Sequence, residues 1–140
     1  MTTTLLIAEN DPTLAELYRQ HFVESGYRVL TASDGSECLA IIRNESPTVL
    51  VAALELPWNV GRGLVDCLRE ESRQRPVPSV ILTGFAPRPH IDDWAEPFLV
   101  RYLAKPVAIS ELLECVRVAQ ARPNDWRIFR VGQSLEYARQ

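Results

Sequence analysis

One short apolar segment limits the folds open to this chain more than any other feature. Residues 49–54 form an uninterrupted apolar run, with Pro47 before it and Pro57 after it. The run is far too short to cross a membrane, and it is typical of a parallel-sheet strand that helices cover on both faces. Open α/β sheets carry their chemistry at the carboxyl ends of such strands. That end is Ala53, two residues before Glu55, so the position best placed for chemistry carries only a methyl group.

Four other short apolar runs predict strands, and segments with apolar residues at helical spacing separate them. The predicted strands cover residues 4–8, 27–32, 77–82 and 99–103. Helices are predicted from Pro12, around residues 38–42, from residue 64, around residues 90–96 and from residue 109. Strands that alternate with helices indicate right-handed βαβ units. We therefore expect an α/β fold with a doubly wound, five-stranded parallel sheet and helices on both faces.

The length of 140 residues fits one domain with a substantial core. We expect this domain to cover residues 1–122. Residues 123–140 carry Trp126, Ile128 and Phe129, which make the segment too apolar for a pure linker and too short for a second domain. This composition predicts a partly ordered C-terminal tail.

The charge balance argues against two classes of partner. A net charge of −3 provides no basis for electrostatic capture of nucleic acid or an anionic membrane. The N-terminal residues lack the basic and apolar regions of a signal peptide. We therefore expect a cytoplasmic protein that binds neither nucleic acid nor a membrane. Cys38, Cys67 and Cys115 lie far apart, which predicts buried free thiols, and the charged run 69–75 predicts a solvated helix end.

Residues that could carry chemistry follow or end four of the predicted strands. They are Glu9 with Asn10, Ala53, Thr83 and Lys105. With the spacing of the prolines and the segment Tyr102-Leu103-Ala104-Lys105-Pro106, this set resembles the receiver (response-regulator) domain of two-component signalling over about residues 4–122. The resemblance implies a flavodoxin-like (CheY-like) fold. It also implies a phosphoacceptor at position 53, a switch hydroxyl at Thr83 and a switch aromatic at Tyr102.

The departures from the receiver pattern shape the functional prediction. The family holds Mg²⁺ with an acidic pair and an acceptor aspartate, and here these positions match Glu9, Asn10 and Ala53. Phosphoryl transfer needs an attacking atom and a metal that neutralises developing charge. We therefore predict a pseudo-receiver with at most weak Mg²⁺ binding at Glu9 and Asn10. We expect no other metal, no cofactor and no enzymatic activity.

Two alternatives remain open. In the first, the chain is a conventional phosphoacceptor in which Glu55 substitutes for the missing aspartate, although chain extension moves Glu55 toward the rim. In the second, the chain is a flavodoxin-like enzyme or a nucleotide-binding protein. We disfavour the second because no glycine-rich loop follows the first strand, where Glu9 and Asp11 would repel phosphate.

The pocket residues can be assigned more than one role. Thr83 either bonds only to its own strand-end turn or keeps part of a switching role. Lys105 requires an anion, because an ammonium in a partly desolvated cleft is costly when unpaired. We predict an ion pair of Lys105 with Glu9 or, failing that, with Glu55.

The predicted activity is phosphorylation-independent binding of another protein, either a signalling protein or a second copy of the chain as a homodimer. The resemblance places the partner face on the fourth helical segment, the fifth strand and the last helix. Trp94, Tyr102 and Pro106 mark this face. Tyr102 could instead be a core residue of an edge strand, and Trp58 could be either a contact residue or a lid over the pocket.

Overall fold

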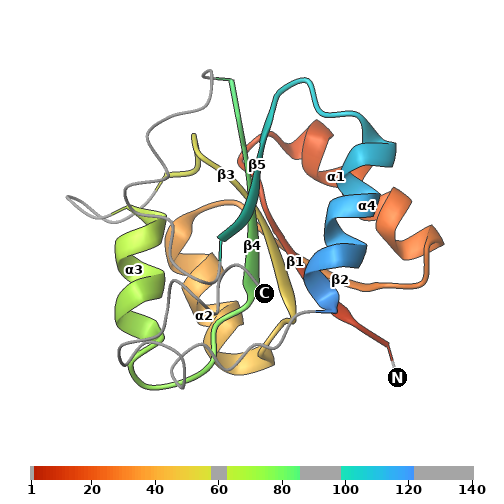
Figure 1. The fold of residues 1–140 in the computed structure, drawn as a ribbon. Coiled ribbons are helices and arrows are strands. Elements are labelled where there is room, and N and C mark those ends of the chain that lie inside the picture. Colours follow the sequence, from red (N-terminus) through yellow and green to blue (C-terminus); the bar gives the residue numbers. More distant parts are fainter. Residues whose placement is uncertain (1, 58–62, 86–98, 122–140) are drawn as a thin grey trace.

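A single parallel sheet forms the centre of the molecule. The computed structural model describes residues 2–57, 63–85 and 99–121. The sheet has five strands in the order β2-β1-β3-β4-β5, and every neighbouring pair is parallel (Figure 1). The strands are β1 (Thr4–Ala8), β2 (Arg28–Ala32), β3 (Val49–Ala53), β4 (Ser79–Gly84) and β5 (Leu99–Ala104). The predicted sheet is thereby confirmed.

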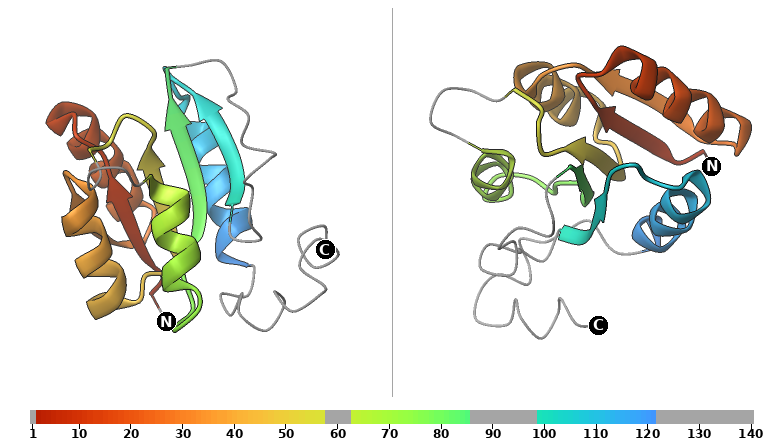
Figure 2. Two further views of the ribbon diagram at one scale, coloured as in Figure 1. Left: turned by 90° about the vertical axis from the view of Figure 1, so that its left-hand side faces the viewer. Right: turned by 90° about the horizontal axis from the view of Figure 1, so that it is seen from above.

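Helices cover both faces of this sheet. The described helices are α1 (Pro12–Glu24), α2 (Gly35–Glu45), α3 (Leu64–Glu71) and α4 (Ile109–Gln120). Figure 2 shows α1 and α4 on one face of the sheet and α2 and α3 on the other. The fold is therefore the doubly wound α/β arrangement that the alternating pattern predicts.

Local sequence signals explain where the first two helices begin. Asp11 caps α1, because its carboxylate accepts hydrogen bonds from the backbone amides of Thr13 and Leu14, and Pro12 occupies the first helical position. Asp34 caps α2 in the same way. Both helices therefore start directly after the carboxyl ends of β1 and β2, which fixes the approach of the chain to that edge of the sheet.

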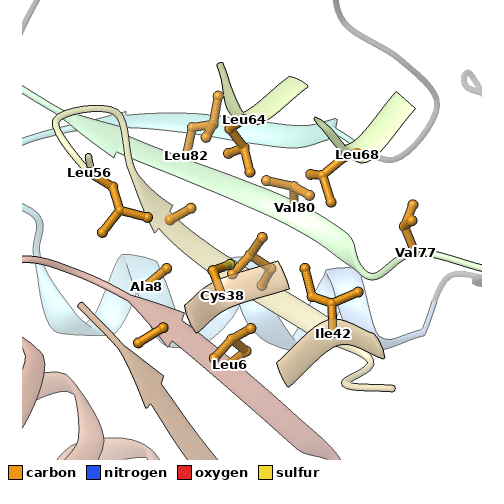
Figure 3. Packing of buried hydrophobic residues seen from close by; sticks show 13 residues of the cluster. Leu6, Ala8, Cys38, Ile42, Leu56, Leu64, Leu68, Val77, Val80 and Leu82 are labelled. Carbon is orange, nitrogen blue, oxygen red and sulfur yellow. The ribbon is translucent and has the colours of Figure 1, made fainter. Parts of the chain in front are cut away.

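The core has two layers, one on each face of the sheet. The layer beneath α2 and α3 is shown in Figure 3 and includes Leu6, Cys38, Ile42, Leu68 and Val80. The layer beneath α1 and α4 is built around aromatic and aliphatic side chains from both helices and from four strands. Every residue of β3 and β4 is buried. The apolar run at residues 49–54 is thus explained by helices on both sides of β3.

Two details of the prediction are wrong. Strand β4 starts at Ser79, two residues later than expected, because Pro78 has no amide to donate to a strand ladder. The charged run 69–75 is not uniformly solvated: Glu71 and Ser72 are buried. Arg43 from α2 reaches the Glu71 carboxylate at 2.8 Å, which draws this end of α3 against its neighbour. A charge run in one helix could not reveal a partner supplied by another.

Several predictions lie outside the described residues: the helix at 90–96, Trp58, Trp94, and the tail at 123–140. The three cysteines are buried thiols outside any disulfide, as predicted, and burial raises the pKa of the Cys38 thiol to about 12. None of the described helices is long and apolar enough to span a membrane.

Candidate functional site

The parallel strands bring their carboxyl ends to one edge of the sheet. Glu9 directly follows β1, Ala53 is the last residue of β3, and Lys105 directly follows β5. Thr83 lies opposite Ala53 in the register of β3 and β4. The residues that the sequence marks at separate strand ends therefore gather at one edge of the fold, as parallel topology requires.

Lys105 forms the centre of this site. Its ammonium nitrogen Nζ lies 2.9 Å from Oε1 of Glu9 and 3.1 Å from Oε1 of Glu55. The lysine side chain is only 4% exposed. The predicted ion pair with Glu9 is confirmed, and Glu55 joins it as a second partner at the same time rather than as an alternative. One ammonium thus bridges two carboxylates.

Backbone contacts hold both ends of the Glu9–Lys105 pair in place. The amide of Glu9 donates to the carbonyl of Ala32 at 2.9 Å, and its carboxylate Oε2 accepts from the amide of Asp11 at 3.1 Å. The amide of Lys105 donates to the carbonyl of Gly84 at 2.7 Å. The pair is therefore anchored to the sheet and does not depend on two mobile surface side chains, which sets it apart from an ordinary surface ion pair.

The two carboxylates determine the protonation state of Lys105. Burial alone would lower the pKa of the ammonium, and the hydrogen bonds to Glu9 and Glu55 together with their charges outweigh that effect. The net result is a pKa above the ordinary value of 10.5. Lys105 is also the single lysine of the sequence, so its ionisation can be followed without interference from other lysines.

Phe85 covers the outer side of this cluster. Its backbone amide donates to Oε2 of Glu55 at 3.3 Å, and its ring centroid lies 5.0 Å from Nζ of Lys105. Phe85 as a whole is 72% exposed. Glu55 therefore links the end of β3, the end of β4 and the lysine after β5. The sequence analysis missed Phe85, and its only signal was its position directly after Thr83-Gly84.

Ala53 and Thr83 form the buried floor beside the charged cluster. Both residues are buried, and the side chain of Ala53 offers no oxygen or nitrogen. The Thr83 hydroxyl oxygen Oγ1 has no hydrogen-bond partner among the described residues. The reading in which this hydroxyl simply bonds to its own strand-end turn is therefore wrong for the part of the chain that the structure describes.

The donor set does not fit the Mg²⁺ ion that the receiver resemblance implies. Both carboxylate oxygens of Glu9 are already used, by Lys105 and by the Asp11 amide, and the Asp11 carboxylate caps α1. Asn10 is exposed and neutral, and Ala53 supplies no ligand. Among the described residues there is no cluster of three or more side chains suited to a metal. Mg²⁺ usually takes one or two carboxylates in octahedral geometry, and here the nearest carboxylate is held by an ammonium.

An open hollow lies beside the charged cluster, next to Glu9 and Asn10. Its volume is about 410 Å³, and Glu16, Ser33 and Glu37 also line it. Three carboxylates on its wall would repel a phosphate group. The hollow therefore does not favour the nucleotide-binding alternative.

The structure brings Tyr102 to the pocket, but Pro106 lies at the exposed surface. Tyr102 is half-buried and packs against the core layer beneath α2 and α3. Burial raises the pKa of its phenol, and the charge of Glu55 raises it further. The third residue of the predicted partner face, Trp94, lies outside the described residues. Of that face, the structure therefore connects only Tyr102 to the charged cluster.

The chain resembles known proteins over most of its length. A family model described as the response regulator receiver domain matches residues 5–117. The polar-differentiation response regulator DivK of Brucella abortus (strain 2308) is 23% identical over 117 residues, which cover 84% of this chain and 95% of that protein. The transcriptional regulatory protein PdtaR of Mycobacterium tuberculosis is 27% identical and is matched over 57% of its own length.

Solved structures agree with this relationship. A putative response regulator from Chloroflexus aurantiacus J-10-fl superposes with a TM-score of 0.70 at 29% identity, covering 87% of this chain and all of that chain. A CheY-like receiver domain protein from Methanospirillum hungatei JF-1 superposes with a TM-score of 0.74 at 22% identity, covering 86% and 95% of the two chains. With the family model matching most of its residues and the sheet order in agreement, this chain belongs to the response regulator receiver domain family.

Proposed function

We propose that this receiver domain acts in two-component signalling by binding a protein partner in the cytoplasm without being phosphorylated. The observation that carries the proposal is the Glu9–Lys105–Glu55 cluster beside Ala53. The acceptor position has no nucleophile, and the cation that would meet an acceptor carboxylate or a phosphoryl group is already neutralised by two carboxylates of the chain.

The chemistry of phosphoryl transfer supports this proposal. The reaction needs an attacking oxygen in line with the leaving group and a cation that stabilises charge in the transition state. Ala53 supplies no attacking oxygen. Glu55 is poorly suited to act as a substitute acceptor. Its Oε1 accepts a hydrogen bond from Lys105, and its Oε2 accepts one from the Phe85 amide.

The family relationship supports the second half of the proposal. Two curated relatives are described as a polar-differentiation response regulator and a transcriptional regulatory protein. We infer that this chain, which lacks an acceptor side chain at position 53, contacts its partner through a surface of the domain. We assign that surface to the strand β5 side around Tyr102 and Pro106, with a signalling protein or a second copy of the chain as the partner.

Intact-mass spectrometry after incubation with acetyl phosphate and Mg²⁺ tests the proposal. The wild-type chain should remain unmodified, and so should Glu55→Gln. The variant Ala53→Asp should take up phosphate only in part, because Asn10 still replaces a carboxylate of the family's acidic pair. A hydroxylamine-sensitive adduct of one phosphate mass on the wild-type protein would refute the proposal. Loss of that adduct in Glu55→Gln would identify Glu55 as the acceptor.

Titration calorimetry with Mg²⁺ provides a second test. Binding should be weak in the wild type, because Glu9 is already paired with Lys105. Tight binding that disappears in Glu9→Ala would contradict the proposal. Partner binding is tested with pull-downs from the source cell that compare the wild type, Tyr102→Ala and a change at Trp94. Capture that acetyl phosphate strengthens would show that phosphorylation matters after all.

A further inference from the structure

Gly84 stands at an unusually crowded point of the pocket. A Cβ atom at this position would lie 2.8 Å from the hydroxyl oxygen of Tyr102 and 2.9 Å from Oε2 of Glu55. It would also lie 3.2 Å from a methyl carbon of Leu54. Side-chain atoms from β5 and from the loop after β3 therefore converge on the face of β4 that the glycine leaves open.

The backbone does not explain the glycine at this position. Gly84 is the last residue of the extended strand β4, whereas Gly26 has a φ of +96° that other residues rarely adopt. Gly63 has neither property, because its φ is −98° and a Cβ there would meet nothing within 4 Å. Space for neighbouring side chains is therefore the specific property that Gly84 provides.

The carboxylate of Glu55 is held at this point from two sides. Lys105 binds its Oε1 at 3.1 Å, and the Phe85 amide donates to its Oε2 at 3.3 Å. The Tyr102 phenol reaches the same side of Gly84, and its raised pKa reflects burial first and the Glu55 charge second. The orientation of Tyr102 is thus tied to a carboxylate that the chain itself supplies.

We propose that Gly84 is the positioning residue that admits the Tyr102 hydroxyl beside the anchored Glu55 carboxylate, so that Glu55 fixes the orientation of Tyr102 on the partner face. The inference deepens the proposed function and depends on it for the role of that face. The Glu55 carboxylate then sets the conformation of the surface around Tyr102, and no phosphoryl group is needed. The arrangement predicts one orientation of Tyr102 in all molecules.

Fluorine NMR of protein labelled with 3-fluorotyrosine tests this inference directly. The chain has four tyrosines, and the signal of Tyr102 is assigned by its loss in Tyr102→Phe. In Gly84→Ala, the new methyl group should displace the ends of the Tyr102 and Glu55 side chains, which can rotate. The Tyr102 signal should shift by more than its linewidth, and its titration should move to lower pH as the phenol gains water. Gly63→Ala is the matched control and should leave the signal in place.

A second variant keeps the test decisive if Gly84→Ala fails to fold. Glu55→Gln preserves the size of the side chain and removes its charge, so the Tyr102 phenol should titrate at lower pH. An unchanged Tyr102 signal in folded Gly84→Ala, an unchanged titration in Glu55→Gln, or an equal shift in Gly63→Ala would each overturn the inference. These outcomes are independent of the acetyl phosphate experiment. Tyr102 can prove insensitive to Glu55 in a protein that still is not phosphorylated, and the reverse also holds.

Discussion

Two ionic clusters with opposite design lie at opposite edges of the sheet. At the carboxyl edge, the single cation Lys105 sits between the carboxylates of Glu9 and Glu55. At the other edge, the carboxylate of Glu71 sits between Arg43 at 2.8 Å and Arg75 at 3.1 Å. In both clusters the central group is buried. The outer groups differ, because Glu9 is buried as well, whereas the two arginine side chains are 51% and 41% exposed.

The burial of the outer charged groups determines whether water can replace a partner that is lost from the cluster. Water can take over the solvation of the half-exposed Arg43 when Glu71 is lost, so that cluster acts mainly as a link between α2 and α3. Water cannot readily replace Lys105 beside the buried Glu9. We therefore infer that the cluster of Lys105, Glu9 and Glu55 is held in one arrangement, while the Glu71 cluster contributes to the packing of α2 against α3.

The largest effect should come from Lys105→Met, which keeps much of the side-chain volume and removes the cation. Two carboxylates, one of them buried, would then lack a positively charged partner. Breaking a buried pair in this way costs about 3–5 kcal/mol in the free energy of unfolding. Urea denaturation followed by circular dichroism measures this loss. A loss below about 1 kcal/mol would show that the pocket cluster behaves like a surface pair.

The pH dependence of that difference sharpens the comparison. The pKa of Lys105 is raised above 10.5 in the folded protein, so its stabilising effect is complete below that pH. The effect is lost as the pH rises through the folded-state pKa. The stability gap between the wild type and Lys105→Met should therefore close only in strongly alkaline solution. Selective ¹⁵N labelling of the single lysine gives the pKa directly from one NMR signal, and a value below 10.5 would contradict the assignment.

Ala53→Asp should have the next largest effect. It adds a larger, charged side chain at a buried position where one ammonium already serves two carboxylates. Overpacking of a core position costs about 1–3 kcal/mol, and the added negative charge acts in the same direction. The double variant Ala53→Asp/Glu55→Gln should recover part of the loss, as measured by urea denaturation. Equal stability of the single and double variants would show that Glu55 and residue 53 do not compete for Lys105.

Glu71→Gln should have a smaller effect. The variant loses the charge-assisted hydrogen bonds of Glu71, and we expect a loss of about 1.5 kcal/mol, the low end for such bonds, because the Arg43 side chain remains hydrated. The hydrogen bond from Arg43 lowers the pKa of Glu71 below its usual 4.5, against the opposing effect of burial. The stabilisation is therefore present above pH 4.5 and is lost as the pH falls through the folded-state pKa. A gap between wild type and variant that persists at lower pH would exclude this ionic origin.

The smallest effect should come from Arg43→Met, the change matched to Lys105→Met. Arg43 is half-exposed, and Glu71 keeps Arg75 as a partner. We expect a loss of about 1 kcal/mol or less, measured under the same denaturation conditions. A loss as large as that of Lys105→Met would abolish the distinction between the two clusters.

The sequence patterns predict the sheet well because a parallel strand that is buried on both faces appears in the sequence as a continuous apolar run. Strand β1 has the bounds that its apolar run predicts, and residues 49–54 coincide with β3 almost completely. The end of a parallel strand is fixed by topology, which is why the pairing of Glu9 with Lys105 could be predicted across most of the chain length. A position at a strand end needs no knowledge of rotamers.

The remaining features depend on side-chain directions that no periodicity records. The simultaneous pairing of Glu55 follows from the path of the loop after β3, and the burial of Glu71 follows from an arginine on another helix. The crowding at Gly84 involves atoms from three segments that the sequence keeps apart. Such contacts become visible only when the segments are packed together.

The hydrogen bond from the Phe85 amide to Glu55 affects the rate at which this amide exchanges with deuterium. Amides within the β-ladder exchange with deuterium only when strands separate, which requires extensive unfolding. The Phe85 amide is held by a side chain of the pocket instead of a neighbouring strand. Exchange of the Phe85 amide requires only that its hydrogen bond to Glu55 breaks, while the sheet stays intact. The rate of deuterium uptake at this single amide therefore reports how often the Glu55 carboxylate separates from it.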